Sequence, residues 1–180
     1  VLLHKLSLIR RRSSTAREFR ALFREMSFYL GYEATQGLGT KEVQVLNAAG
    51  DCVVCTGRKI AERVAVVPVL RGGLAMSDAL LDLLPNAPVY HIGMYRNPAS
   101  QIPIQYYNRL PKGRAADVAI VLDPVIASSR SISAVVSILK TWGAKRVVVI
   151  SLVASRCGLE ALMALHPDIT VLCAAVDELA

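Results

Sequence analysis

The chain has 180 residues, of which 53% are apolar, and a formal net charge of +7. This length supports a full hydrophobic core without disulfides or metals, so we expect a single domain over residues 1–180. No apolar run approaches the roughly 18 residues of a membrane-spanning helix, and no membrane association is expected. The charges of VLLHKLSLIRRR follow its apolar patch, whereas those of a secretory signal precede it, which favours a cytoplasmic protein.

Much of the positive charge is local, because seven basic residues crowd the first 24 positions. They are Lys5, Arg10, Arg11, Arg12, Arg17, Arg20 and Arg24. A polyanion site is one explanation, but the sequence has no RNA-recognition aromatic motif, zinc finger or long basic region. A solvated helix face is the simpler explanation, so nucleic-acid binding is not expected. Positive charge also suits a small substrate with several phosphates.

The cysteines do not have the spacing of a metal site or a redox pair. Cys52 and Cys55 lie in DCVVCTG, which reads as a strand, and side chains three apart on a strand point to opposite faces. Cys157 and Cys173 are interpreted as small core residues, and no histidine stands at ligand spacing from a cysteine. We therefore expect four reduced thiols and no metal held by protein side chains.

In chain order, the first predicted helix follows a capping box made by Thr15 and Glu18. Apolar residues then recur at helical spacing, and the helix is expected to end near Ala34. The segments EVQVL and CVVCT flank an Ala-Gly-Asp turn and predict a β-hairpin. Helix and hairpin together form the N-terminal part of the predicted domain, residues 1–62.

From residue 64 onward, strands alternate with helices. The predicted strands are RVAVVPVL, PVYHIGM, DVAIVLD, RVVVISLV and ITVLCAAV, and the helices between them include LAMSDALLDLL, SAVVSILK and GLEALMAL. Continuous Val, Ile and Leu strands are typical of a parallel sheet that is buried on both faces. The predicted fold class is therefore α/β, with a twisted parallel sheet flanked by helices over residues 63–180. Ligands of such sheets bind at the carboxyl ends of the strands.

The segment MYRNPASQIPIQYYNRLP, residues 94–111, interrupts this alternation. Its turn at residues 97–100 separates two arms that carry Tyr95, Tyr106 and Tyr107, which predicts a β-hairpin arm projecting from the sheet. Two roles stay open for it. The hairpin could be exchanged between subunits or could form a hood over the site.

Three charged residues follow predicted strands: Arg71 after VVPVL, Arg96 after HIGMY and Asp123 after VAIVL. A guanidinium group binds phosphate oxygens bidentately and keeps its charge, which suits a pyrophosphate. A carboxylate can accept hydrogen bonds from two ribose hydroxyls. The hydroxyl-rich loop before the next helix offers unpaired backbone N–H groups, at residues 128–131, to an anion. These features predict a ligand in which a sugar carries phosphates at both ends.

Five motifs, taken in order, resemble those of the uracil phosphoribosyltransferases: VVPVLRGGLAMSDALL, HIGMYRNP, PIQYYNRLP, VLDPVIASSRS and HPDITVLCAAVDE. The resemblance extends over nearly the whole chain, from HKLSLIR onward. It implies the type I phosphoribosyltransferase fold and the reaction of uracil with 5-phosphoribosyl-1-pyrophosphate (PRPP) to give UMP and pyrophosphate, a step of pyrimidine salvage. It further implies Mg²⁺ bound through PRPP, a homodimer or homotetramer and, as in some relatives, a GTP effector.

The same resemblance assigns roles to residues. Arg71 and Arg96 would hold the pyrophosphate, Asp123 the ribose 2- and 3-hydroxyls, and the following loop the 5-phosphate; these three charged residues are the expected catalytic residues. The full PRPP-binding set is Arg71, Arg96, Asp123, Pro124, Val125, Ile126, Ala127, Ser128, Ser129, Arg130 and Ser131. Because the transition state resembles a ribosyl cation with a departing pyrophosphate, catalysis is expected to be electrostatic.

The chain departs from the family pattern in two places. The family loop usually reads A-T-G-G-S or A-T-G-G-T, whereas here it is A-S-S-R-S, so Ser129 and Arg130 replace two glycines. If the backbone has positive φ there, each replacement costs about 1 kcal/mol or more, unless the loop takes another shape. Arg130 would either add charge to the 5-phosphate site or fill it. The family also continues past V-D-E with a segment that reads uracil, and we expect that base-recognition segment to lie outside these 180 residues.

These departures leave a second hypothesis open. A protein of the same fold could have lost catalysis and act as a regulatory subunit or RNA-binding regulator, with Arg130 and the basic N-terminus as the supporting features. Formation of UMP from labelled uracil and PRPP distinguishes the two hypotheses.

Overall fold

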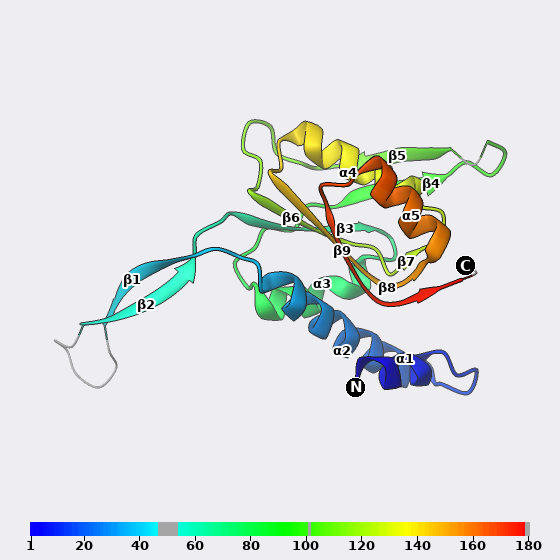
Figure 1. Cartoon of the computed structure of the whole chain (residues 1–180), viewed down its shortest axis with the longest axis horizontal. Helices are drawn as coiled ribbons and strands as arrows, with labels where there is room; N and C mark the ends of the chain where they lie inside the picture. Colours follow the sequence, from blue (N-terminus) through cyan, green and yellow to red (C-terminus); the bar gives the residue numbers. More distant parts are fainter. Residues whose placement is uncertain (47–53, 101, 179–180) are drawn as a thin grey trace.

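A seven-stranded sheet organises the computed structural model, which describes residues 1–46, 54–100 and 102–178 (Figure 1). The strand order is β5-β4-β3-β6-β8-β7, and β9 also pairs with β8. The helices are α1 (Leu2–Ile9), α2 (Ala16–Thr35), α3 (Leu74–Leu83), α4 (Arg130–Trp142) and α5 (Arg156–Leu165). The strands are β1 (Thr40–Leu46), β2 (Val54–Ile60), β3 (Val64–Leu70), β4 (Ile92–Arg96), β5 (Pro103–Asn108), β6 (Val118–Leu122), β7 (Val125–Ile126), β8 (Arg146–Ser155) and β9 (Thr170–Asp177).

The main sheet is parallel except at one edge, where β5 runs antiparallel to β4. Its central strands β3 and β6 are buried almost throughout, and successive residues point alternately to two apolar clusters. Val67 and Val121 pack in the cluster of α4 and α5, whereas Val66 and Ile120 pack in that of α1, α2 and α3. Figure 1 shows these two helical layers on opposite faces of the sheet. The predicted α/β class with a helix-flanked parallel sheet is confirmed.

The N-terminal helices were predicted in part. Thr15 and Glu18 form the expected capping box, and α2 ends at Thr35, one residue beyond the prediction. Helix α1 was not predicted, because its eight residues carry no capping side chain at Val1 and it is fixed by packing of Leu6 in the core. Short helices of this kind depend on tertiary contacts more than on their own propensity.

Both predicted hairpins are present but differ in how they join the body. β1 and β2 pair antiparallel from Thr40–Ile60 to Leu46–Val54 and extend away from the rest of the chain (Figure 1). Their predicted turn and Cys52 lie outside the described residues. The second hairpin, β4–β5, instead continues the main sheet at its edge, with a register shift between Gly93 and Met94.

One prediction about the cysteines is contradicted. Among the described residues, Cys55, Cys157 and Cys173 form no disulfide. Cys173 is partly buried on β9, but the prediction that Cys157 is a core residue is wrong, because its side chain is exposed on the first turn of α5. The buried side of α5 is set by Gly158 and Leu162, and Cys157 falls outside that stripe.

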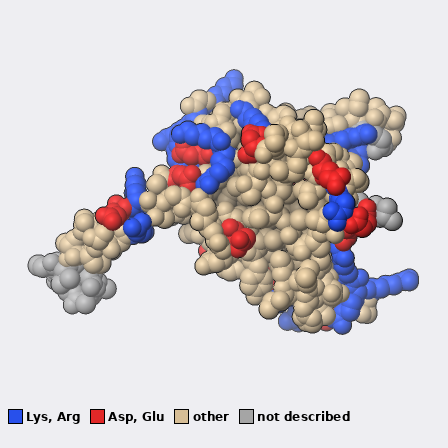
Figure 2. Space-filling view, in the orientation of Figure 1, with Lys and Arg blue, Asp and Glu red and all other residues tan. Residues whose placement is uncertain are grey.

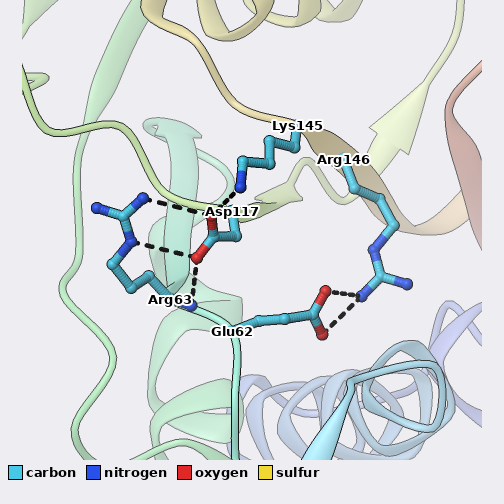
Figure 3. Close-up of polar contacts among 5 residues, drawn as sticks. All are labelled: Glu62, Arg63, Asp117, Lys145 and Arg146. Atoms are coloured by element: carbon cyan, nitrogen blue, oxygen red, sulfur yellow. Dashed lines mark hydrogen bonds and ion pairs between the residues drawn. The ribbon is translucent and has the colours of Figure 1, made fainter.

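An ion cluster joins the amino ends of the central strands (Figure 3). The carboxylate of Asp117, just before β6, accepts hydrogen bonds from the backbone N–H of Arg63 at 2.9 Å and from the Arg63 Nε–H at 3.2 Å. It also forms an ion pair with the Lys145 ammonium at 3.0 Å. Glu62 binds the Arg146 guanidinium at 3.0 and 3.1 Å. The hydrogen bonds from Arg63, with help from Lys145, hold the pKa of the Asp117 carboxyl well below its ordinary value. These contacts bring the starts of β3, β6 and β8 together.

Replacing Asp117 with Asn is expected to lower the thermal unfolding temperature at pH 7, because Asn accepts weaker hydrogen bonds and carries no charge for Arg63 and Lys145. A depressed folded-state pKa contributes stability above the unfolded pKa, about 3.9 for Asp, and that stability is lost as the pH falls. The difference from the wild type should therefore narrow toward pH 3. Calorimetry at pH 7 and pH 3 measures this difference in unfolding temperature, with a Glu160→Gln variant of an exposed residue as the control. If Asp117→Asn and the wild type unfolded at the same temperature at pH 7, the Asp117 charge would contribute nothing to stability.

Candidate functional site

The three charged residues predicted for the site meet at one edge of the sheet. Arg71 directly follows β3, Arg96 is the last residue of β4 and Asp123 directly follows β6. Because β4, β3 and β6 are adjacent and parallel, their carboxyl ends lie side by side. The predicted convergence of these residues at the carboxyl edge is present in the structure.

A cavity of about 800 Å³ lies at this edge, between the ends of β3 and the β4–β5 hairpin. Its lining consists of Leu70, Arg71, Gly72, Met94, Tyr95 and Tyr106. The rings of Tyr95 and Tyr106 are 6.2 Å apart, so the hairpin supplies an aromatic wall. Of the two roles left open for the hairpin, this lining favours the hood. The sequence had marked the tyrosines for the hairpin only and had not assigned them to a site.

The two arginines differ in their surroundings. The Arg96 guanidinium donates a hydrogen bond of 3.0 Å to the Ser128 hydroxyl, which joins the end of β4 to the loop after β6. Arg71 is exposed and forms no ion pair with any residue that the structure describes. A guanidinium that faces a cavity without a protein carboxylate is available to an anionic ligand.

Helix α3 begins very close to the sheet just behind Arg71. A Cβ atom on Gly73 would lie 2.2 Å from the carbonyl oxygen of Leu122, the last residue of β6. Only glycine permits this approach. The R-G-G motif therefore holds the backbone of Arg71 against the end of β6, next to Asp123.

Asp123 lies in a position that is unfavourable for a charge. Burial raises the pKa of its carboxyl to about 7, although a hydrogen bond from the backbone N–H of Val125 acts in the opposite direction. Its own N–H donates to the Ile150 carbonyl, which fixes the residue between β6 and β8. A half-buried carboxylate of this kind can accept hydrogen bonds from ligand hydroxyls in place of water.

The loop from Asp123 to Arg130 is less free than its sequence suggested. Residues Val125–Ile126 form the short strand β7, which pairs with β8, and the Pro124 carbonyl accepts the N–H of Leu152 at 3.0 Å. The sequence predicted an uninterrupted loop there, because two residues are too few to show strand periodicity. The residues outside regular structure are Asp123 and Pro124 before β7 and Ala127 to Ser129 after it.

Ser129 adopts a left-handed conformation, with φ 55° and ψ −17°, and its side chain is buried. Among the described residues it is the one non-glycine position with positive φ. Arg130 instead begins α4, with an exposed side chain. The predicted strain at two replaced glycines is therefore present at one of them. The Arg130 N–H donates to the Ser128 carbonyl at 2.7 Å, so it does not join the anion-facing N–H groups predicted at residues 128–131.

The described residues contain no group of three or more His, Cys, Asp or Glu placed to hold a metal ion, and no helix among them is long and apolar enough to cross a bilayer.

A second hollow, of about 570 Å³, lies near the amino ends of β3 and β6, where Lys59, Arg63 and Arg114 contribute to its lining. None of the residues predicted for the site lies there.

Comparison with known proteins agrees with the resemblance. A family model described as uracil phosphoribosyltransferase matches residues 1–179. A uracil phosphoribosyltransferase of Roseiflexus sp. (strain RS-1) is 44% identical over 97% of this chain and 83% of the relative, and one from Dictyoglomus turgidum is 40% identical over 97% of this chain and 84% of the relative.

Solved structures show the same fold. The structure of the AQ2163 protein from Aquifex aeolicus superimposes with a TM-score of 0.90 at 25% identity, covering 99% of this chain and 84% of that one. A purine phosphoribosyltransferase from Pyrococcus horikoshii superimposes with a TM-score of 0.51 at 19% identity over 65% of this chain and 72% of that one. The fold is thus that of the phosphoribosyltransferases, and with the match along its whole length the chain belongs to the uracil phosphoribosyltransferase family.

Proposed function

We propose that this chain binds PRPP along the carboxyl edge of the sheet and transfers its phosphoribosyl group to uracil, giving UMP and pyrophosphate. Arg71 and Arg96 bind the pyrophosphate, Asp123 the ribose hydroxyls and residues 127–131 the 5-phosphate. One observation carries the proposal: the 3.0 Å hydrogen bond from Arg96 to Ser128, which brings the pyrophosphate side and the 5-phosphate side within reach of one ligand.

The proposed chemistry is mainly electrostatic. Positive charge builds on the ribose as its bond to pyrophosphate breaks, and negative charge builds on the leaving group. The guanidinium groups of Arg71 and Arg96 would stabilise the leaving pyrophosphate, and the carboxylate of Asp123 would orient the ribose. Uracil itself attacks the ribose, so no side chain has to serve as a covalent nucleophile.

Mg²⁺ fits this site as a partner of the substrate. It commonly binds substrate phosphates with one or two carboxylates and keeps several waters, rather than occupying a cage of protein ligands. Among the described residues at the carboxyl edge, Asp123 is the carboxylate next to the phosphate loop, and no three-residue metal cluster accompanies it. When bound to pyrophosphate, the ion would neutralise part of the charge of the leaving group.

A homodimer or homotetramer is supported by the β1–β2 hairpin. This hairpin pairs with no other described strand, and Val45, Leu46 and Val54 on it are exposed. A two-stranded hairpin is only marginally stable alone, so a second subunit is a suitable surface for it. Family membership is the support for two further proposals, a GTP effector and a cytoplasmic location.

The hypothesis of a non-catalytic regulator gains no support from the comparisons. The basic N-terminus, which had suggested it, is partly neutralised, because Lys5 pairs with Glu25, Arg10 with Asp177 and Arg24 with Asp82. Figure 2 shows basic side chains gathered at the end of the molecule where α1 lies in Figure 1.

Transfer is tested by incubating the full-length protein with labelled uracil, PRPP and Mg²⁺ and measuring UMP. The wild type is expected to form UMP. Arg96→Ala should lower kcat/KM for PRPP by a factor that corresponds to about 1.5 to 3 kcal/mol of lost transition-state stabilisation, the contribution of a hydrogen bond to a charged group. Arg114→Ala, at the opposite edge of the sheet, is the control and should match the wild type. Absence of UMP formation by the wild type would reject transfer to uracil. If Arg96→Ala had the same kinetic constants as the wild type, Arg96 would not belong to the site.

Asp123→Asn is expected to abolish efficient use of PRPP while stabilising the fold at alkaline pH. Because the folded-state pKa of Asp123, about 7, lies above its unfolded value, the wild type loses stability as the pH rises between those values. At pH 8 the neutral Asn should therefore raise the free energy of unfolding by on the order of 4 kcal/mol, and the gain should fade toward pH 4. Urea titrations at both pH values check this, and a variant less stable than the wild type at pH 8 would contradict it.

Restoring glycine at positions 129 and 130 should change the free energy of unfolding in opposite directions. Ser129→Gly removes a left-handed serine and should raise the free energy of unfolding by about 0.5 to 1 kcal/mol, after allowing for the greater freedom of glycine in the unfolded chain. Arg130→Gly should lower it by up to about 1 kcal/mol, because Arg130 is a helical residue. Each variant serves as the control of the other in denaturant titrations, and destabilisation by both would argue against strain at Ser129.

A further inference from the structure

Ser155 links helix α5 to the loop that precedes α4. It is the last residue of β8 and the N-cap of α5, and it is 1% exposed. Its hydroxyl donates to the Ala127 carbonyl at 2.5 Å and accepts the N–H of Gly158 at 3.0 Å; the thiol sulfur of Cys157 is 3.3 Å away. Both main roles of a serine hydroxyl, as donor and as acceptor, are thus filled by backbone groups of two different elements.

Gly158 makes this contact sterically close. A Cβ atom at position 158 would lie 2.4 Å from the Ala127 carbonyl oxygen and 2.8 Å from the Ser155 hydroxyl. Real Cβ atoms do not come so near to a backbone oxygen, so the first turn of α5 leaves the loop no room to shift toward it. Ala127 is therefore held by a hydrogen bond and by a tight steric limit.

The segment fixed in this way is the one that carries backbone strain. Ser129, two residues after Ala127, has the positive φ, and Ser128 between them accepts the hydrogen bond from Arg96. A residue in a disfavoured conformation persists only where its surroundings determine it. In the part of the chain that the structure describes, the Ser155 hydroxyl is the side-chain group that binds the loop backbone at Ala127.

We infer that Ser155 is a positioning residue for the phosphate loop. It touches no substrate; it acts through the Ala127 carbonyl and sets where residues 127–131 stand relative to Arg96. The inference rests on the proposed binding of the PRPP 5-phosphate by this loop. It follows that loss of the hydroxyl should weaken PRPP binding without altering the chemical step of PRPP that is already bound.

Kinetics of Ser155→Ala test this role against Ser27→Ala. Ser27 is a matched control, because it is fully buried and donates to a backbone carbonyl, that of Phe23, at 2.8 Å, but lies in α2. Ser155→Ala is expected to raise KM for PRPP about 3- to 10-fold, the effect of one lost hydrogen bond, with kcat little changed. Ser27→Ala should leave both parameters as in the wild type. Equal KM values for the two variants would overturn the inference.

Hydrogen exchange followed by mass spectrometry gives a readout that does not need activity. Peptides covering residues 124–132 should exchange faster in Ser155→Ala than in the wild type, and at wild-type rate in Ser27→Ala. Gly158→Ala keeps the hydroxyl but pushes on the Ala127 carbonyl, so it should produce the same local change. If the wild type forms no UMP, the proposed function fails, but the exchange rates still test the positioning role of Ser155. That role would be rejected if the exchange of residues 124–132 were unchanged in both Ser155→Ala and Gly158→Ala.

Discussion

The parallel pairing of β3, β6 and β8 is the constraint on which the rest of the structure depends. Val64, Val118 and Arg146 stand in register, and so do the residues that follow them. Because each strand is buried on both faces, a shift of one residue would move every side chain from one apolar cluster to the other. The cluster around Asp117 reinforces this register at the amino ends. Parallel strands in fixed register place all their outgoing loops at the opposite edge.

The candidate site makes use of that edge at some cost to stability. A carboxyl whose pKa is raised to about 7 and a serine with φ 55° are both unfavourable for the fold alone. Such features persist where the surrounding structure is rigid, and they concentrate at functional sites. At this edge, β8 supports the loop by pairing with β7, and the start of α5 supports it through the hydrogen bond from Ser155 to the Ala127 carbonyl.

The loop shows how a family motif tolerates the loss of both glycines. The fold needs a left-handed residue at position 129 only, and serine occupies it with its side chain buried. Position 130 is helical, where arginine is a better residue than glycine. Replacement of the two glycines thus carries one conformational penalty, at Ser129.

Local patterns in the sequence were enough to predict most elements, the parallel sheet and the convergence of Arg71, Arg96 and Asp123. Strand composition and capping residues are short-range signals, and parallel strands place their carboxyl ends at one edge. Tertiary structure alone decided the exposure of Cys157, the presence of α1, the single strained position at Ser129 and the link from Ser155 to Ala127. These features depend on groups far apart in the chain, such as Ala127 and Ser155, which are 28 positions apart. A hydrogen bond or a close approach between such groups exists only once the sheet has set their relative positions.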